Sequence, residues 1–171
     1  MASSKAERPK LQVVVPVAAT VAEAVRGRVA GWPWRAHLIE DDQLKDDAFV
    51  AATVALACSG TVTTELALAG APMVVGYRIG PATYFILQRL FRQPYVTLFN
   101  IAAKSEIAPE FLQHDCTGEN LARVVAERLD DPTLRAVQVA QQNAALELMG
   151  RGGPDPSEAA AQAVLKVLGR T

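Results

Sequence analysis

The sequence predicts an α/β protein with a Rossmann-like parallel sheet, helices on both faces of that sheet, and a C-terminal helical tail. Up to about Asn100, short Val-rich runs alternate with segments of helical character. This alternation favours parallel strands, because a parallel crossover usually contains a helix and leaves each strand buried on both faces. After Asn100 the sequence predicts helices alone, which indicates the tail.

The predicted strands are short apolar runs bounded by turn residues. They span Leu11–Val17, Arg35–Ile39, Val54–Cys58, Met73–Tyr77 and Tyr95–Leu98. The helices predicted between them span Thr20–Val29, Asp46–Ala52, Thr61–Ala69 and a segment from Gly80-Pro81 to about Phe91. Thr20 is the expected N-cap of the first helix, since Glu23 follows at the spacing of a capping box. Gly70 and Pro72 close the third helix, because neither residue continues a helix readily.

Three helices are expected in the tail. The first begins at Thr117 and runs to Arg128, and its apolar positions fall on one stripe. That stripe consists of Leu121, Val124, Val125 and Leu129. A longer helix over Pro132–Met149 is followed by a flexible glycine-rich break at 150–154. Asp155 then caps the last helix, with Pro156 at its first position and Glu158 completing a capping box.

Composition narrows the class of protein. The chain has 171 residues, half of them apolar, which is enough for one soluble globular domain. Its formal net charge of -1 gives no electrostatic footprint for nucleic acid, which is therefore not an expected partner. No signal peptide is visible, and no apolar run approaches the ~20 residues that cross a bilayer. The two cysteines, Cys58 and Cys116, suit a reduced compartment, so a cytoplasmic location is expected.

The turn Ser59-Gly60-Thr61 carries the clearest chemistry. It joins a predicted strand to a predicted helix, and such a turn directs backbone N–H groups and a positive helix end at one point, where phosphate binds well. Glu65 lies about one helical turn further on, where a carboxylate can accept both hydroxyls of a ribose. Arg78 follows a strand end, at the sheet edge where open α/β sheets bind ligands, and can pair with a diphosphate.

Three segments carry a family resemblance: 58–78, 94–100 and 106–113. Together they resemble the C-terminal half of lipid-A-disaccharide synthase, an inverting glycosyltransferase of the two-domain, twin-Rossmann (GT-B) type, and the similarity runs from about Leu11 to Leu168. The resemblance implies a UDP-diacylglucosamine donor and an acylated glucosamine 1-phosphate acceptor, without metal or other cofactor. It also implies a peripheral contact with the inner membrane. The donor-nucleotide site implied in this way comprises Ser59, Gly60, Thr61, Glu65, Tyr77, Arg78, Asn100 and Glu106.

The chain departs from that family in several places. It shows neither the acceptor-binding N-terminal domain nor the Pro-Gly-Ser-Arg loop that opens the donor domain, so the expected general base lies in the absent half. Phe99 stands where many members have Pro, and Lys104-Ser105 replaces a common Gly-Arg. We therefore expect a fragment or a truncated gene product. Residues 1–10 are expected to be irregular, 11–116 to form the UDP-sugar domain without its first strand, and 117–171 to add helices to it. The N-terminal half or a second copy is the expected protein partner.

Other interpretations stay open. The chain can be a nucleotide-binding half-domain without catalysis, or part of a peptidoglycan-type UDP-GlcNAc transferase. Taken singly, Glu65 and Arg78 are often solvated charges, and Asn100 is a common turn former. A serine-hydrolase elbow at Ser59 lacks both flanking glycines, and His114-Asp115-Cys116 is a poor metal site because consecutive residues rarely converge on one ion.

Overall fold

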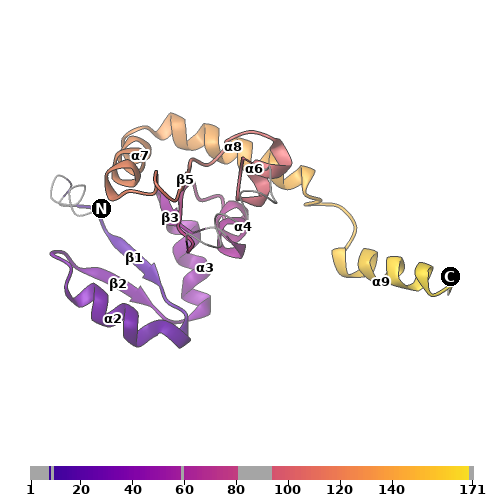
Figure 1. The fold of residues 1–171 in the computed structure, drawn as a ribbon, viewed down its shortest axis with the longest axis horizontal. Coiled ribbons are helices and arrows are strands. Elements are labelled where there is room, and N and C mark those ends of the chain that lie inside the picture. Colours follow the sequence, from indigo (N-terminus) through magenta and orange to yellow (C-terminus); the bar gives the residue numbers. More distant parts are fainter. Residues whose placement is uncertain (1–7, 9, 59, 81–93, 170–171) are drawn as a thin grey trace.

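The structure, a computed structural model, describes residues 8, 10–58, 60–80 and 94–169. Figure 1 shows two groups of strands flanked by helices, with the last helix projecting from the rest of the chain. The helix predicted from Gly80-Pro81 to Phe91 lies outside the described residues beyond Gly80.

All strand pairs in the described part of the chain are parallel, and they form two sheets. β1 (Val13–Pro16) pairs with β2 (Ala36–Ile39), while β4 (Met73–Tyr77) lies between β3 (Ala55–Ala57) and β5 (Glu110–Leu112). The predicted α/β class with parallel strands and flanking helices is thereby confirmed. The strands are divided between a two-stranded and a three-stranded sheet.

The described helices connect these strands and form the tail. They are the short 3₁₀ helix η1 (Ala19–Val21), α2 (Ala22–Ala30), α3 (Asp42–Ala51), α4 (Thr61–Leu68), α6 (Leu98–Ala103), α7 (Gly118–Asp130), α8 (Pro132–Leu148) and α9 (Pro156–Val167). Side-chain oxygens cap several of them: Thr117 caps α7, Asp131 caps α8 and Asp155 caps α9. The predicted starts of all three tail helices are therefore confirmed.

Two predicted helix starts are wrong. Thr20 lies inside η1 rather than at an N-cap, so α2 begins at Ala22 after Val21, with no side-chain cap. Helix α3 begins four residues before the predicted Asp46, because the Asp41 carboxylate accepts a hydrogen bond from the Gln43 N–H and caps the helix there.

The strand predicted over Tyr95–Leu98 is also wrong. Thr97 is the N-cap of α6, and the position beside β4 is taken by β5 instead. The backbone N–H groups of Val96 and Thr97 donate to the Glu110 carboxylate, so they take no part in a strand ladder. A side chain distant in sequence thus overrides the local β-propensity of this segment.

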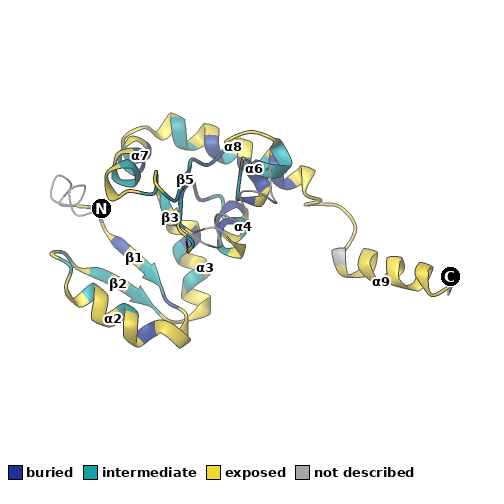
Figure 2. Ribbon diagram, in the orientation of Figure 1, coloured by how far each residue is buried: buried dark blue, intermediate teal, exposed yellow. Residues whose placement is uncertain are grey.

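Helices cover both faces of the three-stranded sheet. On one face, Met73 and Val75 join a buried cluster with residues of α4, α6 and α8 (Figure 2). That cluster includes Leu66, Ala67, Phe99, Ala145 and Leu146. On the other face lies Gly76, where an added Cβ would come within 3.2 Å of Cys116 Sγ and of Leu121 Cδ2 at the start of α7. Glycine at this position therefore lets α7 approach β4 closely.

Candidate functional site

The turn between β3 and α4 has the geometry expected of a tight strand-to-helix junction. Gly60 is the N-cap of α4, with φ 132° and ψ −162°, a conformation that residues with a Cβ rarely adopt. Its carbonyl oxygen accepts from the Thr63 N–H at 3.2 Å and the Thr63 hydroxyl at 2.7 Å, which fixes the first turn of the helix. Ser59 lies outside the described residues.

The amino end of α4 stands at the carboxyl edge of the three-stranded sheet. Thr61, its first residue, is exposed, and no side chain among the described residues caps this end. The N–H groups of Thr61 and Val62 have no acceptor within the helix, so they are available to an anion, whereas the Thr63 N–H already donates to Gly60. Thr64, also in the first turn, has a buried hydroxyl without a partner in the described part of the chain.

Tyr77 and Arg78 lie at this same edge. β3 and β4 are adjacent and parallel, with Ala57 opposite Val75, so the end of β4 lies next to the turn that follows β3. Arg78 is exposed, and its Nε donates to the Gln113 carbonyl at 3.1 Å. The Gln113 N–H in turn donates to the Tyr77 carbonyl at 3.0 Å, so this short loop fixes the base of the arginine. Neither Nη group has a hydrogen-bond partner among the described residues.

Glu65 lies in the second turn of α4 and is half exposed. Its carboxylate is 3.4 Å from Lys45 Nζ on α3, and Lys45 also lies 5.7 Å above the Phe49 ring. Sequence patterns do not indicate Lys45, because a strand separates α3 from α4 and no local spacing connects Lys45 with Glu65. The pair places one cation and one carboxylate beside the turn.

Asn100 and Glu106 are built into a different part of the structure. Asn100 is fully buried, and both its amide nitrogen and its oxygen are used twice within the chain. Nδ2 donates to the Ala108 carbonyl and to Glu110, each at 2.8 Å, while Oδ1 accepts from the N–H groups of Ile107 at 2.8 Å and Ala108 at 3.1 Å. Among the described residues, no hydrogen bond or ion pair connects this group with the Gly60 turn.

The position of Asn100 follows from the strand direction. Ile107 and Ala108 precede β5, which runs parallel to β4, so they lie toward the amino ends of the strands. Glu106 is exposed, and its carboxylate accepts from the Glu110 N–H at 3.4 Å. The predicted site residues therefore divide into one group at the carboxyl edge and a second group, which consists of Asn100 on α6 and Glu106 in the loop before β5.

Glu110 is a residue to which the sequence assigned no role. Its carboxylate accepts from the Val96 N–H at 2.7 Å, the Thr97 N–H at 2.9 Å and the Thr97 hydroxyl at 2.5 Å, as well as from Asn100. It thereby holds the segment that leads into α6 against strand β5. Only the three-dimensional structure brings these groups together, because the partners lie 10–14 residues away.

In the described ranges, no three His, Cys, Asp or Glu side chains gather in a way that would hold a metal ion. No helix within those ranges has the length and apolar character needed to span a membrane.

Nucleotide-binding α/β domains have a parallel sheet and, at its carboxyl edge, a helix that begins after a glycine. Within this class, the model of the family described as lipid-A-disaccharide synthetase matches residues 2–166. The chain therefore belongs to the lipid-A-disaccharide synthetase family, whose members are glycosyltransferases of bacterial lipid A biosynthesis.

Curated relatives agree with this assignment. The chain is 44% identical over 160 residues to the lipid-A-disaccharide synthase of Rhodospirillum centenum, covering 94% of this chain and 40% of that protein. It is 37% identical over 164 residues to the Gluconobacter oxydans protein of the same name, covering 96% and 40%. For the Granulibacter bethesdensis protein the identity is 39% over 173 residues, covering 95% and 44%. The chain thus spans about two fifths of the length of these relatives.

Proposed function

We propose that this chain supplies the UDP-sugar site of a hexosyltransferase in lipid A biosynthesis. The reaction transfers diacylated glucosamine from UDP to an acylated glucosamine 1-phosphate, which gives lipid A disaccharide and UDP. The observation that carries the proposal is the Gly60 turn, whose positive φ opens the amino end of α4 beside Arg78. Family membership supports the choice of a lipid A transferase over a peptidoglycan-type one.

The proposed roles follow from the chemistry of the leaving group. As the anomeric C–O bond breaks, negative charge develops on the diphosphate, and donors placed there in advance stabilise it. Ser59, Gly60 and Thr61 provide backbone and hydroxyl donors, and the Arg78 guanidinium pairs with phosphate oxygens. The Glu65 carboxylate accepts from the ribose hydroxyls, and Tyr77 borders the same pocket.

Asn100 and Glu106 have an indirect role in this proposal. Since the hydrogen-bonding groups of Asn100 are occupied within the chain, we propose it as a positioning residue that holds the loop carrying Glu106. We assign residues 11–116 to the nucleotide-sugar domain and residues 117–171 to helices of that domain. The general base is assigned to the part of the relatives that this chain does not cover, and the reaction to the cytoplasmic side of the inner membrane.

Calorimetry with UDP tests the proposal directly. The chain is expected to bind UDP weakly, and Gly60→Val is expected to abolish binding because a branched Cβ opposes the φ of 132°. Gly70→Val is the matched control, since Gly70 also has positive φ, at 71°, but lies at the far end of α4. Circular dichroism confirms that both variants fold. Unchanged UDP binding in folded Gly60→Val would exclude the turn as the site.

A second candidate is a nucleotide-binding unit that turns nothing over by itself. It is favoured by the share of the relatives that the chain spans, about two fifths. Both candidates predict UDP binding and no turnover by the chain alone. Turnover after the remainder of a relative is added separates them, because only the first candidate predicts it.

A further inference from the structure

Lys45 lies beside the candidate nucleotide site, although it comes from a different helix and is not one of the predicted site residues. It stands in the first turn of α3, which begins just after β2, and α4 begins in the same way after β3. The two helices pack against each other. This packing brings Lys45 Nζ to 3.4 Å from Glu65 Oε2, so α3 supplies the cation that pairs with Glu65.

A buried aromatic ring holds the ammonium group of Lys45 in place. Phe49 lies one turn further along the same helix, belongs to the buried core, and has its ring centroid 5.7 Å from Lys45 Nζ. A cation above an aromatic face is attracted by the ring. Only 31% of the Lys45 side chain is exposed, whereas the Arg123 side chain in the Arg123–Glu127 pair of α7 is 60% exposed. Lys45 is therefore held on two sides, unlike the cation of an ordinary surface pair.

The Glu65 carboxylate leans toward the open end of α4. Thr61 and Glu65 are four residues apart and both are exposed, so they share one face of the helix. Helical side chains point toward the amino end of their helix, which directs this carboxylate toward the turn at Gly60. Lys45 contacts Oε2, while Oε1 has no hydrogen bond within the described ranges. One oxygen is thus fixed, and the other is left to accept from a ligand.

From this arrangement we infer that Lys45 is a positioning residue, which fixes the Glu65 carboxylate for the ribose and makes the site select ribonucleotides over 2′-deoxyribonucleotides. The inference rests on the proposed function, because it needs a nucleotide at the Gly60 turn. A flexible carboxylate loses rotamer freedom when it binds a ligand, and one that is already held loses less. A deoxyribose leaves one acceptor without its hydroxyl, so a site built around that hydroxyl disfavours the analogue.

Direct contact of Lys45 with the diphosphate fits the structure less well. The diphosphate is proposed at the first turn of α4, where the Thr61 and Val62 N–H groups are open. Lys45 lies beside the second turn instead, and its ammonium group is already engaged by Glu65 and Phe49. An effect of Lys45 on nucleotide binding is therefore expected to pass through the ribose.

Calorimetry with UDP, 2′-deoxy-UDP and inorganic diphosphate tests the inference. The unchanged chain should prefer UDP over 2′-deoxy-UDP by roughly tenfold, the value of one hydrogen bond to a charged group. Lys45→Gln should reduce this preference by about threefold, the scale of a partly exposed ion pair, and should leave diphosphate binding unchanged. Lys45→Arg keeps the charge and the aromatic contact, so it should retain most of the preference.

Two further variants separate positioning from a merely structural role. Lys166→Gln removes the same charge from the last turn of α9 and should retain the full preference for UDP. The double variant Lys45→Gln/Glu65→Gln should bind UDP as Glu65→Gln alone does, because Lys45 acts through Glu65. Urea unfolding of each variant checks that the chain stays folded.

Three results would overturn the inference while UDP binding stands. These are an unaltered preference for UDP in Lys45→Gln, equal losses of UDP and diphosphate binding in that variant, and losses that add in the double variant. Absence of UDP binding by the unchanged chain would instead overturn the proposed function, and this inference with it.

Discussion

At the scale of single residues, the buried side chain of Asn100 connects several parts of the backbone by hydrogen bonds. Its side chain connects α6 to the backbone before β5 through three hydrogen bonds and to the Glu110 side chain through a fourth. Asn100→Ala is expected to destabilise the chain by roughly 1–3 kcal/mol, because buried N–H and carbonyl groups lose their partners. Urea unfolding measures this loss.

Two variants control the Asn100 measurement. Asn143→Ala removes an amide whose oxygen accepts from Arg151 at an exposed position, and should cost far less. Asn100→Asp keeps the acceptors but directs a carboxylate at the Ala108 carbonyl and at Glu110, so it should be at least as destabilising as Ala. Native stability in both Asn100 variants would show that the network is not needed for folding.

The Glu65 carboxylate can either bind the ribose or only support its helix, and a substitution distinguishes these two functions. If it accepts the ribose hydroxyls, Glu65→Gln should weaken UDP binding by roughly tenfold, because hydrogen bonds to a charged group are worth about 1.5–3 kcal/mol. Inorganic diphosphate, which has no ribose, should bind almost as before. Calorimetry with both ligands makes the comparison, and Lys45→Gln controls for the loss of the Lys45–Glu65 pair. Equal losses for UDP and diphosphate would mean that Glu65 only supports the helix.

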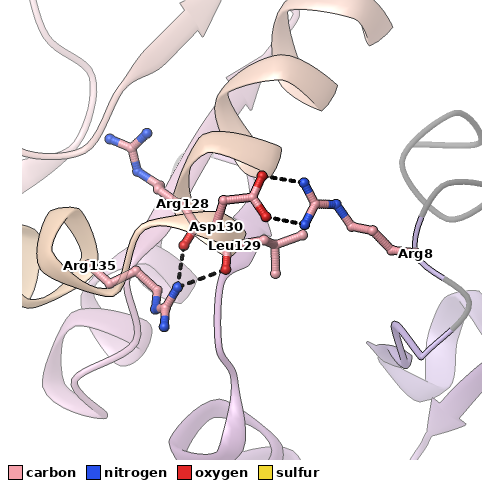
Figure 3. A network of polar contacts seen from close by, with 5 residues as sticks. All are labelled: Arg8, Arg128, Leu129, Asp130 and Arg135. Carbon is pink, nitrogen blue, oxygen red and sulfur yellow. Dashed lines mark hydrogen bonds and ion pairs between the residues drawn. The ribbon is translucent and has the colours of Figure 1, made fainter.

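The junction of α7 and α8 stands out at the scale of elements. A single residue, Asp131, connects the two helices and caps α8 by accepting from the N–H groups of Thr133 and Leu134. Arg135 Nη1 donates to the Arg128 carbonyl at 2.5 Å and the Leu129 carbonyl at 3.0 Å, which satisfies the last carbonyls of α7 (Figure 3). The angle between the helices is thus fixed by side chains from both.

Asp130 joins the N-terminal segment to this junction. Arg8 donates both terminal nitrogens to the Asp130 carboxylate, and this hydrogen bonding lowers the pKa of Asp130 below its usual range (Figure 3). Because the pKa is lower in the folded state, the pair stabilises the fold above the unfolded-state pKa of about 3.9. The stabilisation is lost as the pH falls through the lowered pKa.

An NMR titration of the Asp130 carboxyl group tests this contact. In Arg8→Gln the pKa of Asp130 is expected to rise toward its ordinary range, whereas Arg26→Gln, which removes the Arg26–Glu40 pair, should leave it unchanged. The same pKa of Asp130 in the unchanged chain and in Arg8→Gln would contradict the structure at this point.

Sequence patterns predicted elements well where the signal was local. The strands near residues 13–16, 36–39, 55–57 and 73–77 were predicted, and so were the capped starts of α7, α8 and α9, because periodicity and capping residues lie within a few positions of one another. The strand at Tyr95–Leu98 was wrong and β5 was not predicted, since the carboxylate that decides between them comes from Glu110.

The candidate site could be predicted only in part for a related reason. The Ser-Gly-Thr turn is local, and its glycine has the positive φ that such a turn requires. The Lys45–Glu65 pair and the burial of Asn100 arise from contacts between elements, which no spacing in the sequence indicates. Nucleotide binding by the candidate residues is a prediction that the calorimetric experiments test.

At the scale of the whole molecule, one helix, α9, is uncovered. The described side chains of α9 are exposed, among them Val164, Leu165, Val167 and Leu168. Figure 2 shows this helix apart from the buried residues around the sheet. An exposed apolar surface of this kind favours association with another surface.

We expect no turnover by the 171-residue chain alone. General-base catalysis needs a group within hydrogen-bond reach of the attacking hydroxyl. We expect that group in the part of the relatives that this chain does not cover, because the chain spans about two fifths of their length. With UDP-diacylglucosamine and the acylated sugar phosphate, UDP release should stay at background. Calorimetric binding of UDP under the same conditions is the control for folding.

The complementary experiment adds the separately expressed remainder of a relative, which should restore some release of UDP. Turnover by this chain without any addition would contradict the expectation, and would place the catalytic base among its own residues.

The spacing of two glutamines on helix α8 matches the spacing of two backbone carbonyls at the start of strand β4. Gln138 Nε2 donates to the Met73 carbonyl at 2.7 Å and Gln142 Nε2 to the Ala71 carbonyl at 3.1 Å. Four residues of helix advance about 6 Å and two residues of strand about 6.6 Å, so the amides reach successive carbonyls on one side of the chain. One residue inserted between the glutamines would turn the second amide by about 100° around the helix, away from its acceptor. An insertion or deletion in this stretch should therefore disrupt the contact between α8 and the sheet, whereas the exposed glycine-rich connection before α9 should tolerate a change in length.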